Sequence, residues 1–166
     1  MKSSILKNLG YSAISTLVRI YSGSVVFIIL ARLLAIEDFG ILSFGISLAG
    51  LVSVCSEFGF SIMTMRDIPQ NKFEFNNYIF NTFLQKVLIS LIVYILAIIY
   101  VYACFSSISL HVGIIFIIAG ILLSYFFYGL AIFKSKGLFQ FETSITIINA
   151  VLLTVIVYLQ YKFNFS

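Results

Sequence analysis

The sequence predicts an all-helical integral membrane protein with about five transmembrane helices and a cytoplasmic amino terminus. Of its 166 residues, 61% are apolar and only 10% are charged, whereas soluble domains carry about 25% charged residues. The apolar residues gather in long runs, and a helix needs such a run of ~20 residues to cross a bilayer. We therefore expect residues 1–166 to form a single polytopic domain in contact with membrane lipid.

Five apolar runs predict the spans, which cover about 11–34, 41–65, 78–105, 112–133 and 143–161. Polar, turn-forming stretches separate them at 37–40, 66–71, 106–111 and 134–142. Pro69 supports the second of these turns, because proline lacks a backbone donor. Residues 73–86 mix asparagines, Thr82 and Gln85 with aromatic residues. This mixture indicates a water-facing start to the third helix.

The distribution of basic residues predicts the orientation, because Lys and Arg accumulate on the cytoplasmic side of a membrane. With the amino terminus inside, the cytoplasmic ends carry Lys2, Lys7, Arg66, Lys72, Lys134 and Lys136. The outer ends carry Arg32 and Lys162. An odd number of spans then places the carboxyl terminus outside.

Composition and motifs also argue against several functional classes. The net charge of +4 comes from basic residues that stand singly between apolar runs, so no nucleic-acid partner is expected. The sequence has no metal-ligand spacing, no nucleophile motif and no glycine-rich phosphate loop. His111, the only histidine, lies in a predicted outer loop without an acidic neighbour. We expect neither an enzyme nor a metal site.

Arg19 and Glu57 stand out because ionisable residues are rare inside transmembrane helices. A charge at the bilayer centre costs about 3 kcal/mol on insertion scales, so it is usually paired or faces a cavity. Each residue lies eight positions from the cytoplasmic end of its predicted span, which corresponds to roughly 12 Å of helix. Equal depth on adjacent helices permits an ion pair. A water-filled cavity for an anionic substrate and snorkelling of the side chain are the alternatives.

Lys86 is the third candidate. It could reach a similar depth if the third helix begins near Tyr78. The favoured interpretation is an interfacial anchor just before the apolar core, because lysine can bury its stem and keep its ammonium in water.

Six short segments form an ordered set along the chain. The first two are Ala31–Leu34 and Glu37–Gly40, at the end of the first span. Those that follow are Ser47–Leu51, Phe58–Ser61, Arg66–Ile68 and Tyr125–Leu130. Their order and spacing resemble Wzx-type polysaccharide (O-antigen) flippases over essentially the whole chain.

This resemblance implies a MATE-like transporter of the multidrug/oligosaccharidyl-lipid/polysaccharide superfamily. Such proteins flip undecaprenyl-diphosphate-linked oligosaccharides to the outer leaflet of the bacterial plasma membrane, for O-antigen and lipopolysaccharide biosynthesis. The resemblance implies that Arg19 attracts the diphosphate, and that Glu57 positions Arg19 or takes part in ion coupling. Arg19, Glu57 and Lys86 are therefore the predicted substrate-binding residues. No cofactor is expected, and protons or sodium would supply the coupling.

Five spans are fewer than the family requires. The chain lacks the last helix of the first lobe and the whole second lobe, while transporter sites lie between two lobes. We therefore expect a truncated first lobe that is inactive alone, with the carboxyl-terminal part as a candidate partner chain. Two alternatives stay open: a small membrane subunit or scaffold without transport activity, and a multidrug exporter of the same superfamily.

Overall fold

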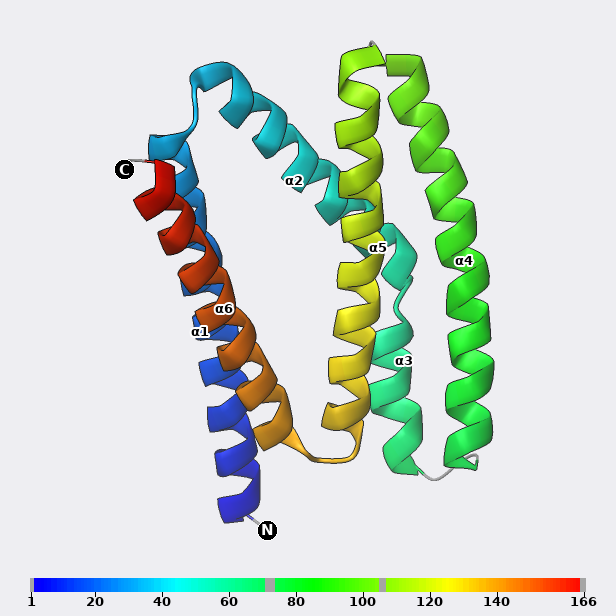
Figure 1. Cartoon of the computed structure of the whole chain (residues 1–166). Coiled ribbons are helices and arrows are strands. Elements are labelled where there is room, and N and C mark those ends of the chain that lie inside the picture. Colours follow the sequence, from blue (N-terminus) through cyan, green and yellow to red (C-terminus); the bar gives the residue numbers. More distant parts are fainter. Residues whose placement is uncertain (1, 71–73, 105–106, 165–166) are drawn as a thin grey trace. The chain divides into compact units, whose positions relative to one another are not determined.

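The computed structural model describes residues 2–70, 74–104 and 107–164, and within these ranges it is entirely helical (Figure 1). Its helices are α1 (Lys2–Leu33), α2 (Ile36–Glu57), α3 (Phe60–Asp67), the short 3₁₀ helix η1 (Ile68–Gln70), α4 (Phe75–Cys104), α5 (Ser107–Ser135) and α6 (Phe139–Asn164). The predicted loop residues Asn71, Lys72 and Ser106 lie outside these described ranges.

Five of these helices contain segments long and apolar enough to cross a membrane. The segments are Lys7–Leu33, Ile36–Glu57, Phe75–Ala103, His111–Ser135 and Phe139–Gln160. Large apolar side chains are exposed along all five, which is the pattern expected where lipid replaces water as the solvent. The predicted all-helical membrane fold with five spans is confirmed.

The chain divides into two compact units. One comprises Met1–Gly40 with Gly137–Ser166, and the other comprises Ile41–Lys136. In the first unit α1 and α6 run side by side in the same direction, as Figure 1 shows in blue and red. Two hydrogen bonds tie their amino-terminal halves together: Thr143 Oγ1 donates to Tyr11 O at 3.1 Å, and Ser15 Oγ donates to Glu142 at 3.1 Å.

The second unit is built around α5, which packs against α3 and α4. A small apolar core lies in this unit and consists of Leu48, Val52, Val101 and Ile117. Glycine allows the helices to approach closely here. A Cβ atom added at Gly120 would lie 2.5 Å from the backbone oxygen of Ala49, so that α2 and α5 are in backbone contact, as small residues permit in membrane helices.

The prediction that 41–65 form one continuous helix is wrong. It breaks at Phe58 and Gly59, whose φ angles are +42° and +82°. Glycine adopts this left-handed conformation without steric cost, and α3 then begins at Phe60. The break places Glu57 at the very end of α2, and this position sets up the site described below.

Three predicted turns also need correction. Glu37 and Asp38 lie in the first turn of α2 and do not end the preceding helix; carboxylates are favourable there because of the helix dipole. Arg66 and Asp67 belong to α3. The predicted loop at 106–111 is helical from Ser107 onward.

The last predicted loop, 134–142, is much shorter in the structure. α5 continues through Ser135, and α6 begins at Phe139 after a turn in which Gly137 has a φ of +73°. Glu142 is consequently part of α6, and it is only 1% exposed.

Candidate functional site

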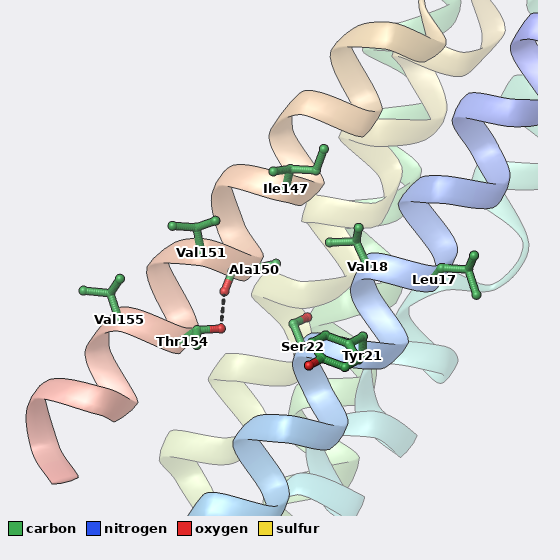
Figure 2. A pocket seen from close by; sticks show the side chains of 9 residues that line it. All are labelled: Leu17, Val18, Tyr21, Ser22, Ile147, Ala150, Val151, Thr154 and Val155. Carbon is green, nitrogen blue, oxygen red and sulfur yellow. Dashed lines mark hydrogen bonds between the residues drawn. The ribbon is translucent and has the colours of Figure 1, made fainter.

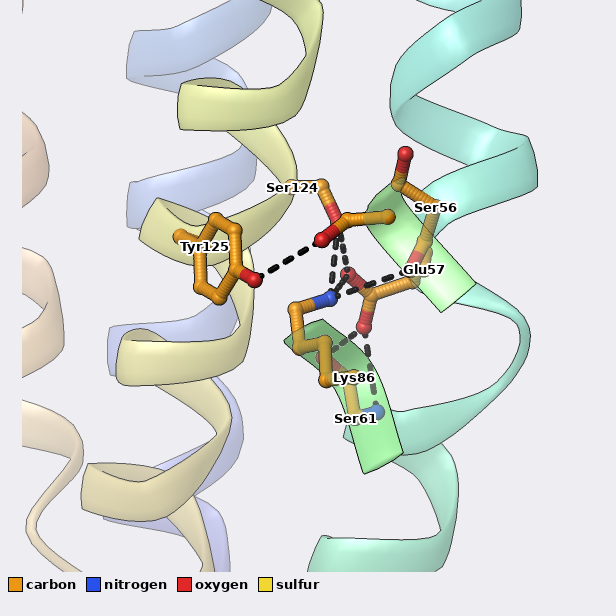
Figure 3. Close-up of polar contacts among 7 residues, drawn as sticks. Ser56, Glu57, Ser61, Lys86, Ser124 and Tyr125 are labelled. Atoms are coloured by element: carbon orange, nitrogen blue, oxygen red, sulfur yellow. Dashed lines mark hydrogen bonds and ion pairs between the residues drawn. The ribbon is translucent and has the colours of Figure 1, made fainter. Parts of the chain in front are cut away.

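Lys86 lies at the centre of a buried polar cluster in the second unit. Its side chain, in the fourth turn of α4, is 0% exposed, and Figure 3 shows Glu57 of α2 and Ser124 of α5 beside its ammonium. The interpretation of Lys86 as an interfacial anchor is therefore wrong. An anchor requires its ammonium to reach water, and this ammonium is enclosed by protein.

The three donors of the Lys86 ammonium match three oxygen acceptors around it. Nζ lies 2.7 Å from Ser124 Oγ, 3.1 Å from Glu57 Oε2 and 3.4 Å from the carbonyl oxygen of Ser56. A lysine ammonium has three N–H groups and no acceptor, so its hydrogen-bonding capacity is fully used. Burial of a lysine without such partners would be prohibitively costly.

Aromatic rings complete the enclosure of the ammonium. The ring centroids of Phe60, Tyr125 and Tyr128 lie 5.4–5.6 Å from Nζ, within the range of cation–π attraction. Ser90 and the Tyr125 hydroxyl share a hydrogen bond of 2.9 Å, which holds that ring in place. The site is thus a cage for one monovalent cation, already occupied by the protein's own ammonium.

Glu57 joins this cage to the helix break. One carboxylate oxygen, Oε2, accepts hydrogen bonds from Lys86 and from Ser124 at 3.2 Å. The other, Oε1, accepts from the backbone N–H of Ser61 at 3.0 Å and from the Ser61 hydroxyl. Because Ser61 N–H is one of the open donors at the start of α3, Glu57 caps that helix. A single carboxylate therefore connects α2, α3, α4 and α5.

Arg19 belongs to the first unit, where it is exposed on α1. Within the second unit, the partner of Glu57 is Lys86. The proposed pairing of Arg19 with Glu57 stays a prediction, and so does the proposed contact of Arg19 with a substrate diphosphate.

An apolar groove lies between α1 and α6 in the first unit (Figure 2). It encloses about 610 Å³, and the residues that line it are Leu17, Val18, Tyr21, Ser22, Ile147, Ala150, Val151, Thr154 and Val155. The hydroxyls of Ser22 and Thr154 donate to carbonyl groups of their own helices, at 3.1 and 2.8 Å. Since the lining has no charged residue, this groove is not a candidate site for an anionic group.

Sequence reasoning missed several residues of the cation cage. Ser124 and Tyr128 lie on α5 within or beside the segment Tyr125–Leu130, which was singled out for resemblance and not for chemistry. One signal was available: Ser124 interrupts an apolar run four residues before Tyr128, and polar residues in membrane helices tend to face other helices.

At the cytoplasmic end predicted for α3, Arg66 and Asp67 form an ion pair of 2.8 Å. The hydrogen bond to the Asp67 carboxylate and its charge raise the pKa of the exposed Arg66 guanidinium. Arg66 therefore keeps its positive charge at every physiological pH, as its role in the predicted orientation requires.

The helices and the caged ion pair define a polytopic membrane protein with an ionic centre inside its spans. Residues 5–162 match the family model described as polysaccharide biosynthesis protein, and the chain belongs to that family. Comparisons with curated proteins and with solved structures returned no match.

Proposed function

We propose that this protein takes part in flipping undecaprenyl-diphosphate-linked oligosaccharides across the bacterial plasma membrane. Membership of the polysaccharide biosynthesis family supports a substrate that contains a glycan. The five candidate membrane spans support a substrate that is linked to a lipid. The observation that carries the proposal is the fully buried Lys86, paired with Glu57 inside those spans. Ionisable residues within candidate membrane spans are usually functional, because they are costly to insert.

In this proposal, the cage stabilises the Lys86 ammonium inside the membrane until a substrate phosphate binds it. In the observed state Glu57 neutralises Lys86 at 3.1 Å. Phosphate oxygens could replace the carboxylate as acceptors for the same ammonium, because both are anionic and accept several hydrogen bonds. Arg19, exposed on α1 in the first unit, keeps its own proposed role as a diphosphate contact, since its planar guanidinium can bind two phosphate oxygens at once.

We further propose that Glu57 takes part in ion coupling, with protons or sodium as the coupling ion. The Lys86 ammonium already occupies the position between Glu57 Oε2, Ser124 Oγ and the Ser56 carbonyl. Any coupling ion would bring a second positive charge to these oxygens, which is favourable only once the ammonium has moved to another anion, such as the substrate diphosphate. Loss of the 3.1 Å contact between Lys86 and Glu57 would also loosen the cap that Glu57 places on α3. The break at Gly59 would then let α2 and α3 change their angle, as alternating access requires.

Depletion of the protein in its native host tests the proposed function. We expect surface polysaccharide to fall while lipid-linked oligosaccharide accumulates in the membrane with its sugars facing the cytoplasm. Lectin labelling of inside-out and right-side-out vesicles measures that orientation. Normal surface polysaccharide without accumulation of the intermediate would contradict the proposal.

Variants at the two proposed cations test the diphosphate contacts. Arg19→Ala should reduce export strongly, while Arg19→Lys should retain part of it, because lysine keeps the charge but loses the two-pronged geometry. Unchanged export with both Arg19 variants would remove Arg19 from the mechanism. Lys86→Met should abolish export, and immunoblots of the membrane fraction separate this effect from the loss of stability that an unpaired Glu57 causes.

A further inference from the structure

A polar groove lies at the amino-terminal end of α4, separate from the cation cage. It encloses about 330 Å³, and the residues that line it are Glu74, Asn77, Tyr78, Asn81, Thr82 and Gln85. Their spacing of three and four places them along one side of the helix. This is the polar stretch that the sequence indicated as water-facing, and the proposed flipping mechanism leaves it without a role.

Hydrogen bonds fix one end of the groove and leave its centre open to a ligand. Asn77 Nδ2 donates to Glu74 Oε2 at 2.8 Å, and the Tyr78 hydroxyl donates to Asp67 Oδ2 at 3.3 Å. The side chains of Asn81 and Gln85 are exposed, and within the described part of the chain their amides make no hydrogen bond to protein. These two amides lie one helical turn apart, and each can donate and accept at once.

The lining chemistry distinguishes between classes of ligand. No Lys or Arg lines the groove, and Glu74 gives it a negative charge, so a phosphate would be repelled. A neutral ligand rich in hydroxyl groups fits better, because each hydroxyl also donates and accepts. Amides in pairs can bind neighbouring hydroxyls, and Tyr78 adds an aromatic side chain for the apolar face of a ring.

We propose that this groove binds a sugar unit of the transported oligosaccharide. The inference rests on the proposed function, and it assigns the sugar and the diphosphate to different faces of α4. Gln85, in the groove, directly precedes Lys86, in the cage. The volume is at the small end of the ~300–1,000 Å³ range of ligand pockets, which suits a single sugar unit and not a whole oligosaccharide.

Binding of free sugars to the purified full chain tests this assignment directly. The detergent must lack a sugar headgroup, which would itself compete. Saturation-transfer NMR with methyl glucoside, galactose and N-acetylglucosamine should show contact with at least one sugar, and inorganic phosphate should not displace it. Asn81→Leu and Gln85→Leu should each weaken binding roughly fivefold to tenfold, as expected for the loss of hydrogen bonds worth about 1 kcal/mol or slightly more.

Asn76→Leu is the matched control, because Asn76 is an exposed amide of α4, like Asn81 and Gln85, but does not line the groove. It should bind sugars like the wild type. Should Asn81→Leu fail to fold, Asn81→Ser, which keeps a polar group but shortens it, takes its place.

Three results would overturn the sugar site: absence of sugar contact in the wild type, equal losses with Asn76→Leu and Asn81→Leu, or displacement by phosphate. Loss of the flipping function is a separate outcome. Sugar binding that depends on Asn81 and Gln85 without any effect of depletion on export would refute the flippase and leave the site in place.

Discussion

Ser15 and Glu142 are 127 residues apart in the sequence, and the Ser15 hydroxyl donates to the Glu142 carboxylate at 3.1 Å. The serine is 0% exposed and the glutamate 1%. Together they join α1 to α6 at the start of α6, where a carboxylate is also favoured by the helix dipole. The contact ties the two ends of the chain into one unit.

Ser15→Ala should therefore destabilise the protein by about 1–3 kcal/mol, because a buried carboxylate loses a donor. Thermal unfolding in detergent, followed by circular dichroism, measures the effect. Thr16→Ala is the control, since the exposed Thr16 hydroxyl donates to a carbonyl of its own helix at 2.9 Å and its loss should be nearly neutral. Equal effects of the two variants would show that the Ser15 contact does not stabilise the unit.

A double-mutant cycle should show strong coupling between Lys86 and Glu57. Removing one partner leaves an uncompensated buried charge, which costs about 3–5 kcal/mol; the lower end applies because the Glu57 side chain is 21% exposed. Lys86→Met with Glu57→Gln should restore much of that loss. Strictly additive effects of the two substitutions on unfolding would argue against a stabilising pair.

Gly120→Ala should weaken the packing of α2 on α5. The added methyl would meet the Ala49 backbone at 2.5 Å, and overpacking of this kind costs about 1–3 kcal/mol. On the same helix, a Cβ at Gly129 has no neighbour within 4 Å, so Gly129→Ala should be neutral or stabilising by up to ~1 kcal/mol. Unfolding temperatures of the two variants in one detergent decide the comparison, and a reversed order would contradict it.

Gly59→Ala should strain the break between α2 and α3. At the φ of +82° found for Gly59, an alanine lowers the stability of the fold by about 1–2 kcal/mol. Asparagine tolerates this left-handed region better. We therefore expect Gly59→Asn to be more stable than Gly59→Ala, by thermal unfolding. If the two variants unfold alike, or if alanine proves the more stable, then the left-handed conformation is not what requires glycine there.

Reporter fusions test the orientation that the basic residues predict. A fusion after Asn71 should be cytoplasmic, and one after Ser109 should be external. The physical reason is the accumulation of Lys and Arg on the cytoplasmic side. The opposite pattern would invert the topology and move the polar groove of α4 to the outer face.

Much of the fold could be predicted from the sequence, because apolar run length is a local property. Turn positions were less predictable. Glu37 and Asp38 are polar and suggested a loop, yet carboxylates also favour the first turn of a helix, where the structure places them. The break at Gly59 was hidden within an apolar run, since glycine occurs both inside membrane helices and at helix ends.

The candidate site was predicted in part. Glu57 and Lys86 both stand out in the sequence as unusual charges, but an ion pair of Glu57 with Arg19 was only one of three interpretations, and the favoured place for Lys86 was the membrane interface. A residue's depth in the membrane can be counted along the chain, whereas the direction of its side chain depends on how its helix is rotated against the others. Ser124 interrupts an apolar run and so gave a signal, but its contact with Lys86 and the enclosure by the three aromatic rings depend on how α3, α4 and α5 pack.

The sequence by itself determined that this is an integral membrane protein, because a chain with 61% apolar residues in long runs has no stable arrangement in water. It also predicted the orientation, through the placement of lysine and arginine. Only the tertiary structure decided that Lys86 is enclosed and that Glu57 is its partner, 29 residues away. The physical reason is that a buried charge is stabilised by the few oxygens within hydrogen-bonding distance, and helix packing alone brings those oxygens together.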